Sequence, residues 1–406
     1  MAAMKDIIAG NPNLLKDNQV TQWHKAFREG GAGSFEATME VINGFSQGKI
    51  PEVVLDRTIQ QTIWDDYIDI AERFNEPGRF TSIIGYEWTS TEDGNNLHRN
   101  VLYRDDGDRA RRMVPYTTAE SFNPEDLWTW MARYEEATGG QVLALAHNGN
   151  MSNGIMFPVE TNPATGKALT GDYAKQRARW EPLYEVTQIK GDGETHPLLS
   201  SDDEFADFET LALGNLNLTV PKEDKMLKYE YAREALKNGL KLEAKLGTNP
   251  YKFGMVGSSD THTALAAVEE DNYIGKHSGT EPSADRWNHP MAKFAGRQYE
   301  GYAMSSSGYA AVWATENTRE ALFDAMKRKE VYATTGPRIL VRFWGGWDFV
   351  DADANSRLPG EVGYTKGVPM GGDMSKAPKG KKPTFLVAAL KDPYGANLDR
   401  IQIVKG

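Results

Sequence analysis

Asp260 and His262 place a carboxylate and an imidazole two residues apart, a spacing at which both groups can bind one metal ion. In an extended chain, the side chains at positions i and i+2 lie on the same face, so both would point toward the ion. Ser258, Ser259 and Thr261 are small and leave room for the ion and its water. The alternative interpretation is an Asp that caps a helix, followed by an unrelated His.

Three more candidate ligands stand at the ends of predicted strands. His147 directly follows the apolar run 142–146, and His98 opens another apolar run. Glu87 lies among aromatic residues in the predicted strand 80–88. A buried, unpaired carboxylate is unfavourable, so Glu87 needs a cation, a proton or a neighbouring Arg or Lys. The competing interpretations are a hydrogen-bonded core residue for His147 and a surface loop residue for His98.

A polar segment after the predicted strand 184–190 supplies three candidates for catalysis. Lys190, Glu194 and His196 could protonate a leaving group or contact a substrate. A solvated loop without a chemical role is the alternative for this segment.

The elements that must position these groups alternate between helix and strand. Helices are predicted over residues 53–74, between Asn123 and Gly139, over 225–246 and from Asn317, and each precedes a short apolar strand, at 80–88, 142–146, 253–256 and 331–334. This alternation favours a parallel sheet or a closed barrel, in which chemistry gathers at the carboxyl ends of the strands. We therefore predict an α/β fold.

The C-terminal part changes in composition. Residues 355–383 are rich in Gly, Pro and Lys and are predicted to form a long loop. The runs 384–390 and 398–404 flank a turn and predict two strands of a small β module. We accordingly predict a barrel domain over residues 1–345, followed by a linker and a partial β module over 346–406.

Composition narrows the function classes. The 406 residues are 40% hydrophobic, which is enough for one large domain with an appendage. The formal charge of −11 argues against nucleic acid or an anionic membrane as the partner. The absence of cysteine excludes disulfides and thiolate ligands, so a metal site must use His, Asp and Glu. No apolar run is long enough for a membrane span, and residues 1–10 lack the basic region and apolar core typical of a signal peptide, so we expect none there.

Five blocks of the sequence resemble the polymerase-and-histidinol-phosphatase (PHP) superfamily of metallohydrolases, in particular the DUF3604 family and its relatives of carbaryl-hydrolase type. The blocks are Gly85-Tyr86-Glu87-Trp88, His98-Arg99-Asn100, Ala146-His147-Asn148-Gly149-Asn150, Gln188-Ile189-Lys190-Gly191 and Gly257-Ser258-Ser259-Asp260-Thr261-His262. The resemblance extends from about residue 5 to the end of the chain.

This resemblance implies a distorted (β/α)7 barrel that holds two or three divalent ions, zinc or manganese. Glu87 would bridge two ions, His98 and His147 would bind separate ions, and Asp260 with His262 would close the site. A metal-activated hydroxide would attack a phosphoester or a carboxyl or carbamoyl ester in a small-molecule substrate. Family members often carry export signals, so the resemblance also implies a periplasmic or secreted location.

One feature departs from the superfamily pattern, which opens with a His-x-His strand end and a further histidine. This chain contains no His-x-His, and His24 is its only histidine before Glu87. We expect a barrel that is incomplete at its N-terminus, with these ligands either truncated or lost. The isolated chain is therefore expected to bind metal weakly and to turn over little substrate.

The expected function is a divalent-metal-dependent hydrolase of ester bonds. The alternative is an inactive fragment or a barrel-type protein that binds a ligand without hydrolysis. In the latter, tryptophans could line a carbohydrate site instead of the core; they are Trp88, Trp128, Trp130, Trp180 and Trp313. A Ser-His-Asp hydrolase is a third and less favoured alternative. No pattern in the sequence defines an oligomeric state.

Overall fold

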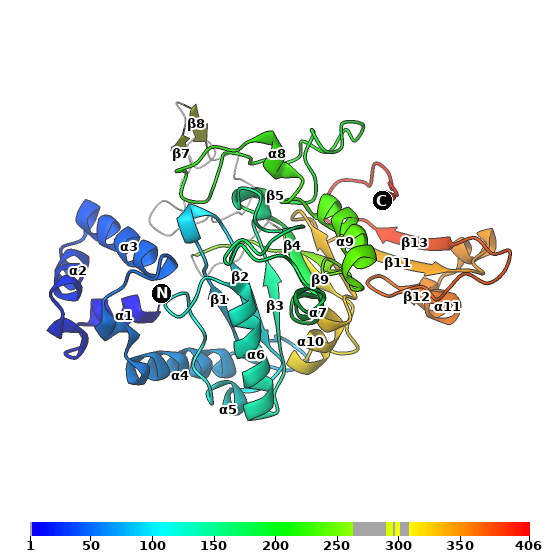
Figure 1. The fold of residues 1–406 in the computed structure, drawn as a ribbon. Coiled ribbons are helices and arrows are strands. Elements are labelled where there is room, and N and C mark those ends of the chain that lie inside the picture. Colours follow the sequence, from blue (N-terminus) through cyan, green and yellow to red (C-terminus); the bar gives the residue numbers. More distant parts are fainter. Residues whose placement is uncertain (1, 263–289, 295–296, 301–307) are drawn as a thin grey trace.

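The structure is a computed structural model that describes residues 2–262, 290–294, 297–300 and 308–406. A mixed sheet forms its centre, with the N-terminal helices on one side and a small β module on the other (Figure 1). The helices are α1 (Ala2–Ala9), α2 (Asn18–Glu29), α3 (Gly31–Ser46), α4 (Arg57–Arg73), α5 (Gly107–Ala110), α6 (Pro124–Thr138), α7 (Gly171–Trp180), α8 (Asp224–Leu227), α9 (Ala232–Leu246), α10 (Arg319–Lys327) and α11 (Pro359–Lys366). The strands are β1 (Gly85–Trp88), β2 (Arg99–Tyr103), β3 (Val142–Ala146), β4 (Leu183–Gln188), β5 (Gly191–Asp192), β6 (Gly254–Gly257), β7 (Pro290–Phe294), β8 (Arg297–Glu300), β9 (Tyr309–Val312), β10 (Val331–Thr334), β11 (Leu340–Gly346), β12 (Gly367–Pro369) and β13 (Thr384–Leu390).

The central sheet has six strands and confirms an α/β fold. β3, β4 and β6 are parallel, whereas β1, β2 and β3 pair antiparallel, as do β4 and β5. Residues 89–98 connect β1 to β2 directly, and such a connection is too short for the crossover that parallel strands need. Across the described residues the sheet stays open, so the expected (β/α)7 barrel is not confirmed.

Side chains on the central strands alternate between two faces. The outer face packs beneath α4, α6, α7 and α9 (Figure 1). Its core includes Trp88, Val101, Ala144 and Tyr184. On the inner face, a second cluster joins β3, β4, β6 and β10 to α10. Because strand side chains have a period of two, a residue two positions beyond an inner-face residue at a strand end also faces inward.

The tryptophans belong mainly to this core. Trp88, Trp128, Trp130 and Trp180 are all buried in the outer-face cluster. A platform for stacking on a sugar would need exposed ring faces. These four side chains therefore stabilise the packing of helices on the sheet.

Local signals set the helix ends where the sequence predicts them. Asp56 caps α4, because its carboxylate accepts hydrogen bonds from the amides of Thr58 and Ile59. Asn123 caps α6, and Gly139 ends that helix with a left-handed φ of 69°. These two helices match the prediction within a few residues.

Two predicted helix boundaries are wrong. The single helix expected over residues 225–246 is divided into α8 and α9. The break coincides with Glu230, which is buried and bonds to the Lys222 ammonium and to the amide of Gly154. The helix expected from Asn317 is capped one residue later, by Thr318.

The C-terminal module is a three-stranded antiparallel sheet in the order β12–β11–β13. Residues 355–383 are not simply a loop, because they contain α11 and β12. Of the two strands predicted in the module, the one at 384–390 forms as β13, and the one at 398–404 does not form. β13 pairs with β11, which also pairs with β12. β11 spans the predicted boundary at residue 345, and the domain division itself stays a prediction.

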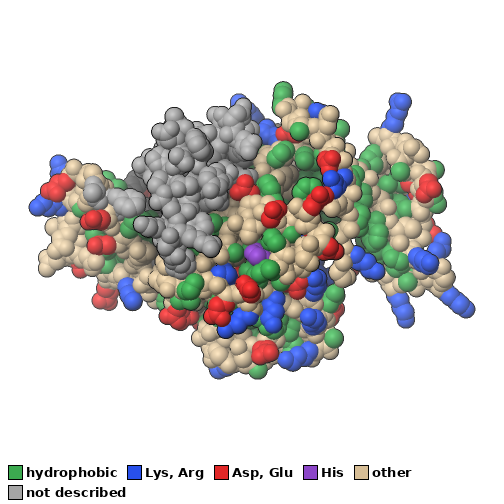
Figure 2. Space-filling model, turned by 90° about the horizontal axis from the view of Figure 1, so that it is seen from above, with side chains coloured by type: hydrophobic (Ala, Val, Ile, Leu, Met, Phe, Trp, Pro, Cys, Tyr) green, Lys and Arg blue, Asp and Glu red, His purple; other side chains and the backbone are tan. Residues whose placement is uncertain are grey.

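Seen from above, the module stands apart from the main body, with Lys and Arg side chains along its rim (Figure 2).

The N-terminal helices form their own hydrophobic cluster. Val20 and Trp23 of α2 pack with Val41 of α3 and with Ile59 of α4. Since α4 also contributes to the outer-face core of the sheet, it ties these helices to the central sheet. Within the described residues, no helix has the length and apolar character needed to cross a membrane.

A buried ion network fixes the start of β2. The Arg99 guanidinium lies 3.0 Å from a Glu181 carboxylate oxygen, and both side chains are almost fully buried. Arg177 reaches the other oxygen of the same carboxylate at 3.2 Å, and the Trp128 indole donates to the first. Removal of one partner would leave a buried charge without compensation.

We predict that Arg99→Leu lowers the free energy of unfolding by about 3–5 kcal/mol, the cost typical of breaking a buried ion pair. Arg79→Ala is the control, because Arg79 pairs with Glu76 on the surface and should change the free energy by less than about 1 kcal/mol. Urea unfolding followed by circular dichroism measures both. Equal effects of the two substitutions would contradict a structural role of the buried network.

Candidate metal centre

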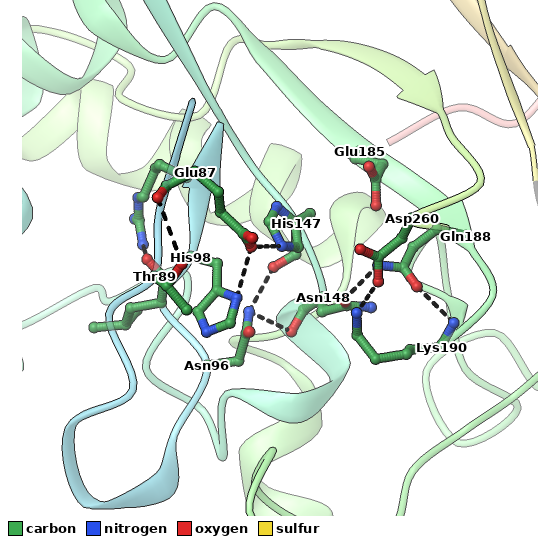
Figure 3. A network of polar contacts seen from close by, with 12 residues as sticks. Glu87, Thr89, Asn96, His98, His147, Asn148, Glu185, Gln188, Lys190 and Asp260 are labelled. Atoms are coloured by element: carbon green, nitrogen blue, oxygen red, sulfur yellow. Dashed lines mark hydrogen bonds and ion pairs between the residues drawn. The ribbon is translucent and has the colours of Figure 1, made fainter. Parts of the chain in front are cut away.

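Glu87, His98 and His147 come from the ends of three neighbouring strands, β1, β2 and β3 (Figure 3). Leu143 and Leu145 of β3 belong to the inner-face cluster, so the period of two carries His147 to the same face. The register pairs Arg99 with Ala146, and the preceding His98 therefore lies opposite His147. The backbone thus brings all three side chains to one face of the sheet.

The three side chains meet at one carboxylate oxygen. Oε1 of Glu87 lies 2.9 Å from Nδ1 of His98 and 3.0 Å from Nε2 of His147. The two imidazole rings are nearly perpendicular, with centroids 5.4 Å apart. One ligand atom from each residue lies within 4.8 Å of the others, and this is the only such group of three or more His, Asp or Glu in the described parts of the chain.

Burial shapes the charge states of the triad formed by Glu87, His98 and His147. His98 is 7% exposed, and this burial lowers its pKa to about 4 although the Glu87 carboxylate opposes the shift. Burial raises the pKa of Glu87, but the two histidines outweigh it and hold that pKa well below its usual range. At neutral pH the triad therefore combines a carboxylate with a neutral His98 imidazole, the form that binds a metal ion.

Two residues that sequence reasoning missed hold the triad in place. Thr91 Oγ1 lies 2.9 Å from the second ring nitrogen of His98, which fixes the orientation of that ring. The Asn96 amide donates to the carbonyls of His147 and Asn148, at 2.7 and 3.2 Å (Figure 3). The sequence shows both only as part of a polar turn, because their partners depend on how β2 and β3 are paired.

The backbone after β3 turns sharply at the site. Asn148 adopts a left-handed conformation with φ 49°, which is uncommon for a residue other than glycine. At Gly149, a Cβ atom would come within 2.2 Å of the Glu230 carbonyl. A residue with a side chain would not fit there, so the Asn-Gly pair accounts for the way the chain leaves His147.

A second polar cluster adjoins the triad through Asn148. Gln188 of β4 donates to Oδ1 of Asn148 at 2.6 Å and to Oδ2 of Asp260 at 2.8 Å. The Lys190 ammonium forms an ion pair with the same Asp260 oxygen. Asp260 thus lies beside the triad without sharing its donor group (Figure 3).

The structure places the remaining predicted site residues differently. His262 is exposed, and its Nδ1 lies 3.0 Å from the carbonyl of Asp260. The chain is not extended there, because Asp260 has a φ of 48°, so the two side chains do not share a face as the sequence suggested.

The Glu194 carboxylate pairs with Arg233 at 2.8 Å, and the His196 ring lies 5.6 Å from the Tyr231 ring. Among the three catalytic candidates, Lys190 contacts the polar cluster next to the triad, through Asp260.

The donor set fits a divalent cation. Two imidazoles and one carboxylate are a common ligand set for zinc and leave positions open for water or substrate. Nε2 of His147, the ring nitrogen that faces Glu87, is buried and forms no hydrogen bond among the described residues, so this nitrogen can bind a cation. The arrangement can therefore hold one cation through Glu87, His98 and His147.

Fold and site together define an α/β protein with a candidate His2Glu metal centre at the ends of its strands. The chain belongs to the DUF3604 family, described as proteins of unknown function, whose family model matches residues 1–406. No curated protein and no solved structure matches the chain.

The lowered pKa of His98 predicts a stability that depends on pH. An unfolded histidine takes up a proton below its ordinary pKa of 6.5, whereas His98 in the folded protein stays neutral until about pH 4. The folded state therefore loses about 2 kcal/mol between pH 7 and pH 5 from this residue.

Urea unfolding at both pH values measures this loss. We expect His98→Gln to reduce the pH dependence by that amount, whereas His24→Gln in the N-terminal helices should keep the wild-type dependence. An unchanged pH dependence in His98→Gln would refute a buried neutral imidazole at this position.

Proposed function

We propose that this protein is a divalent-metal-dependent hydrolase of phosphoester or carboxyl or carbamoyl ester bonds. The observation that carries the proposal is the convergence of His98 and His147 on one carboxylate oxygen of Glu87, at 2.9 and 3.0 Å. Three protein ligands with open positions are typical of catalytic zinc sites, whereas structural zinc sites are usually closed by four ligands.

Glu87, His98 and His147 would hold the divalent ion, which would supply Lewis-acid chemistry for the activation of water and of an ester group. The chain's own groups orient this chemistry. Glu87 supplies the negative charge, and Thr91 fixes the ring of His98 so that Nδ1 faces the carboxylate. Lys190, held by Asp260, keeps an ammonium beside the site that can bind the anionic part of a substrate or protonate a leaving group.

We also propose that the central sheet corresponds to part of a PHP-type barrel. The parallel strands β3, β4 and β6 support this relation, since helices α7 and α9 pack on their outer face. His147, Gln188 and Asp260 follow or end these strands, so the polar groups gather at the carboxyl ends, as in barrel enzymes. Zinc and manganese remain the expected ions, and a small molecule the expected substrate.

The test of the metal centre is binding of Zn²⁺ or Mn²⁺ to the purified chain, measured by titration after dialysis against a chelator. We expect weak but saturable binding by the wild type. Glu87→Gln and His147→Asn should lower the affinity by more than about 100-fold, because even outer partners of metal ligands contribute about 10- to 100-fold. His24→Gln, which alters a histidine outside the site, should leave binding unchanged.

Hydrolysis is tested separately with p-nitrophenyl phosphate and p-nitrophenyl esters in the presence of added Mn²⁺ or Zn²⁺. Activity that requires the ion and disappears in His147→Asn supports the proposal. Metal binding at the triad without any hydrolysis would favour a non-catalytic binding protein. Hydrolysis that survives both chelation and His147→Asn would exclude the proposed centre.

A further inference from the structure

Glu185 is a buried carboxylate beside the metal centre, and it forms no ion pair within the described part of the chain. Its residue is 4% exposed, and Oε2 accepts a hydrogen bond of 2.5 Å from the hydroxyl of Ser258. Oε1 is fully buried and has no hydrogen-bond partner among the residues that the structure describes. A buried carboxylate held by one neutral hydroxyl is strongly unfavourable unless a positive charge lies nearby.

The strand pattern directs Glu185 to the metal centre. The register pairs Leu145 with Leu183 and Ala146 with Tyr184, so Glu185 lies at the level of His147 on the neighbouring strand. Leu183 belongs to the inner-face cluster, and the period of two places Glu185 on that same face. Figure 3 shows its carboxylate in the space bordered by His147 and Asp260.

The charges of this region favour a divalent cation. Among the described residues of this region, the carboxylates of Glu87, Glu185 and Asp260 bring three negative charges, whereas Lys190 brings one positive charge. With both imidazoles as neutral metal ligands, the sum is minus three plus one, or minus two. One divalent cation at the triad would balance this sum, and Glu185 is the carboxylate whose described hydrogen bond comes from a neutral group, the Ser258 hydroxyl.

We infer that Glu185 is the charge-balancing carboxylate of the cation site formed by Glu87, His98 and His147. This inference rests on the proposed metal centre and adds a residue that is outside its donor group. Glu185 acts on the ion through the low-dielectric interior, without a direct bond, and so raises the affinity for divalent over monovalent cations. In the metal-free protein the same buried charge destabilises the folded state, and binding of the cation removes this destabilisation.

Two opposite effects of Glu185→Gln follow from this role. The amide keeps the size of the side chain and an oxygen for Ser258, but it removes the charge. Mn²⁺ affinity should fall by about 10- to 100-fold, as for other outer partners of a metal site, with an unchanged number of bound ions. The melting temperature of the metal-free protein should be unchanged or raised, whereas a purely structural carboxylate would lower it.

Lys190→Met is the variant of opposite sign. It removes the positive charge beside the site. Mn²⁺ affinity should rise, because the Lys190 ammonium no longer offsets the attraction of the Glu185 and Asp260 carboxylates for the ion. Glu330→Gln is the matched control: Glu330 is also 4% exposed, but it pairs with Arg328 away from the centre. Its substitution should leave Mn²⁺ affinity unchanged.

The experiment is a Mn²⁺ titration of the full chain in which electron paramagnetic resonance counts the free ion, combined with melting curves of the chelator-treated proteins. Wild-type binding with a weaker Glu185→Gln and an unchanged Glu330→Gln supports the inference. Wild-type binding with equal affinity in Glu185→Gln overturns it and leaves the metal centre intact. The absence of saturable binding in the wild type overturns the metal centre itself, and the inference with it.

Discussion

The contact of one Glu87 oxygen with two imidazole nitrogens is the interaction on which the rest of the site depends. It joins a carboxylate and two histidines from the ends of three strands, of which β1 and β2 are neighbours in the sequence and β3 lies about forty residues further on. Such a contact tolerates only small errors in strand pairing, because a shift by one residue would turn each side chain to the opposite face. The fold must therefore fix the register of β1, β2 and β3.

The outer face of the sheet provides that fixation. Trp88 and Arg99, which directly follow Glu87 and His98, point away from the site into the core beneath α4, α6 and α7. There the Arg99 guanidinium binds Glu181, so the residue next to each ligand is held by burial or by a buried ion pair. The packing of the outer face stabilises the sheet. The inner face can therefore hold several carboxylates close together, although their charges repel one another.

Much of the local structure could be predicted from sequence because it depends on neighbouring residues. The strand 142–146 and the helix between Asn123 and Gly139 follow from apolar runs and capping residues, and both are confirmed. Glu87, His98 and His147 were recognisable because a carboxylate or imidazole at the end of an apolar strand needs a partner. Family membership was also recognisable, from blocks that surround these residues.

What the sequence could not provide depends on distant contacts. The antiparallel pairing of β1 and β2, the open sheet and the break at Glu230 arise from packing between separate segments. The spacing of Asp260 and His262 suggested a shared face, but the left-handed backbone of Asp260 and its contacts with Gln188 and Lys190 decide otherwise. Thr91 and Asn96 have no sequence signal of their own, because only the folded chain brings them to the histidines.

Anomalous X-ray diffraction at the zinc edge, from crystals of this chain grown with Zn²⁺, tests the central claim most directly. The account predicts a peak about 2.0–2.2 Å from the Glu87 oxygen and from one nitrogen each of His98 and His147. Zinc bound only elsewhere, with the Glu87 oxygen still in direct contact with both imidazoles, would contradict it.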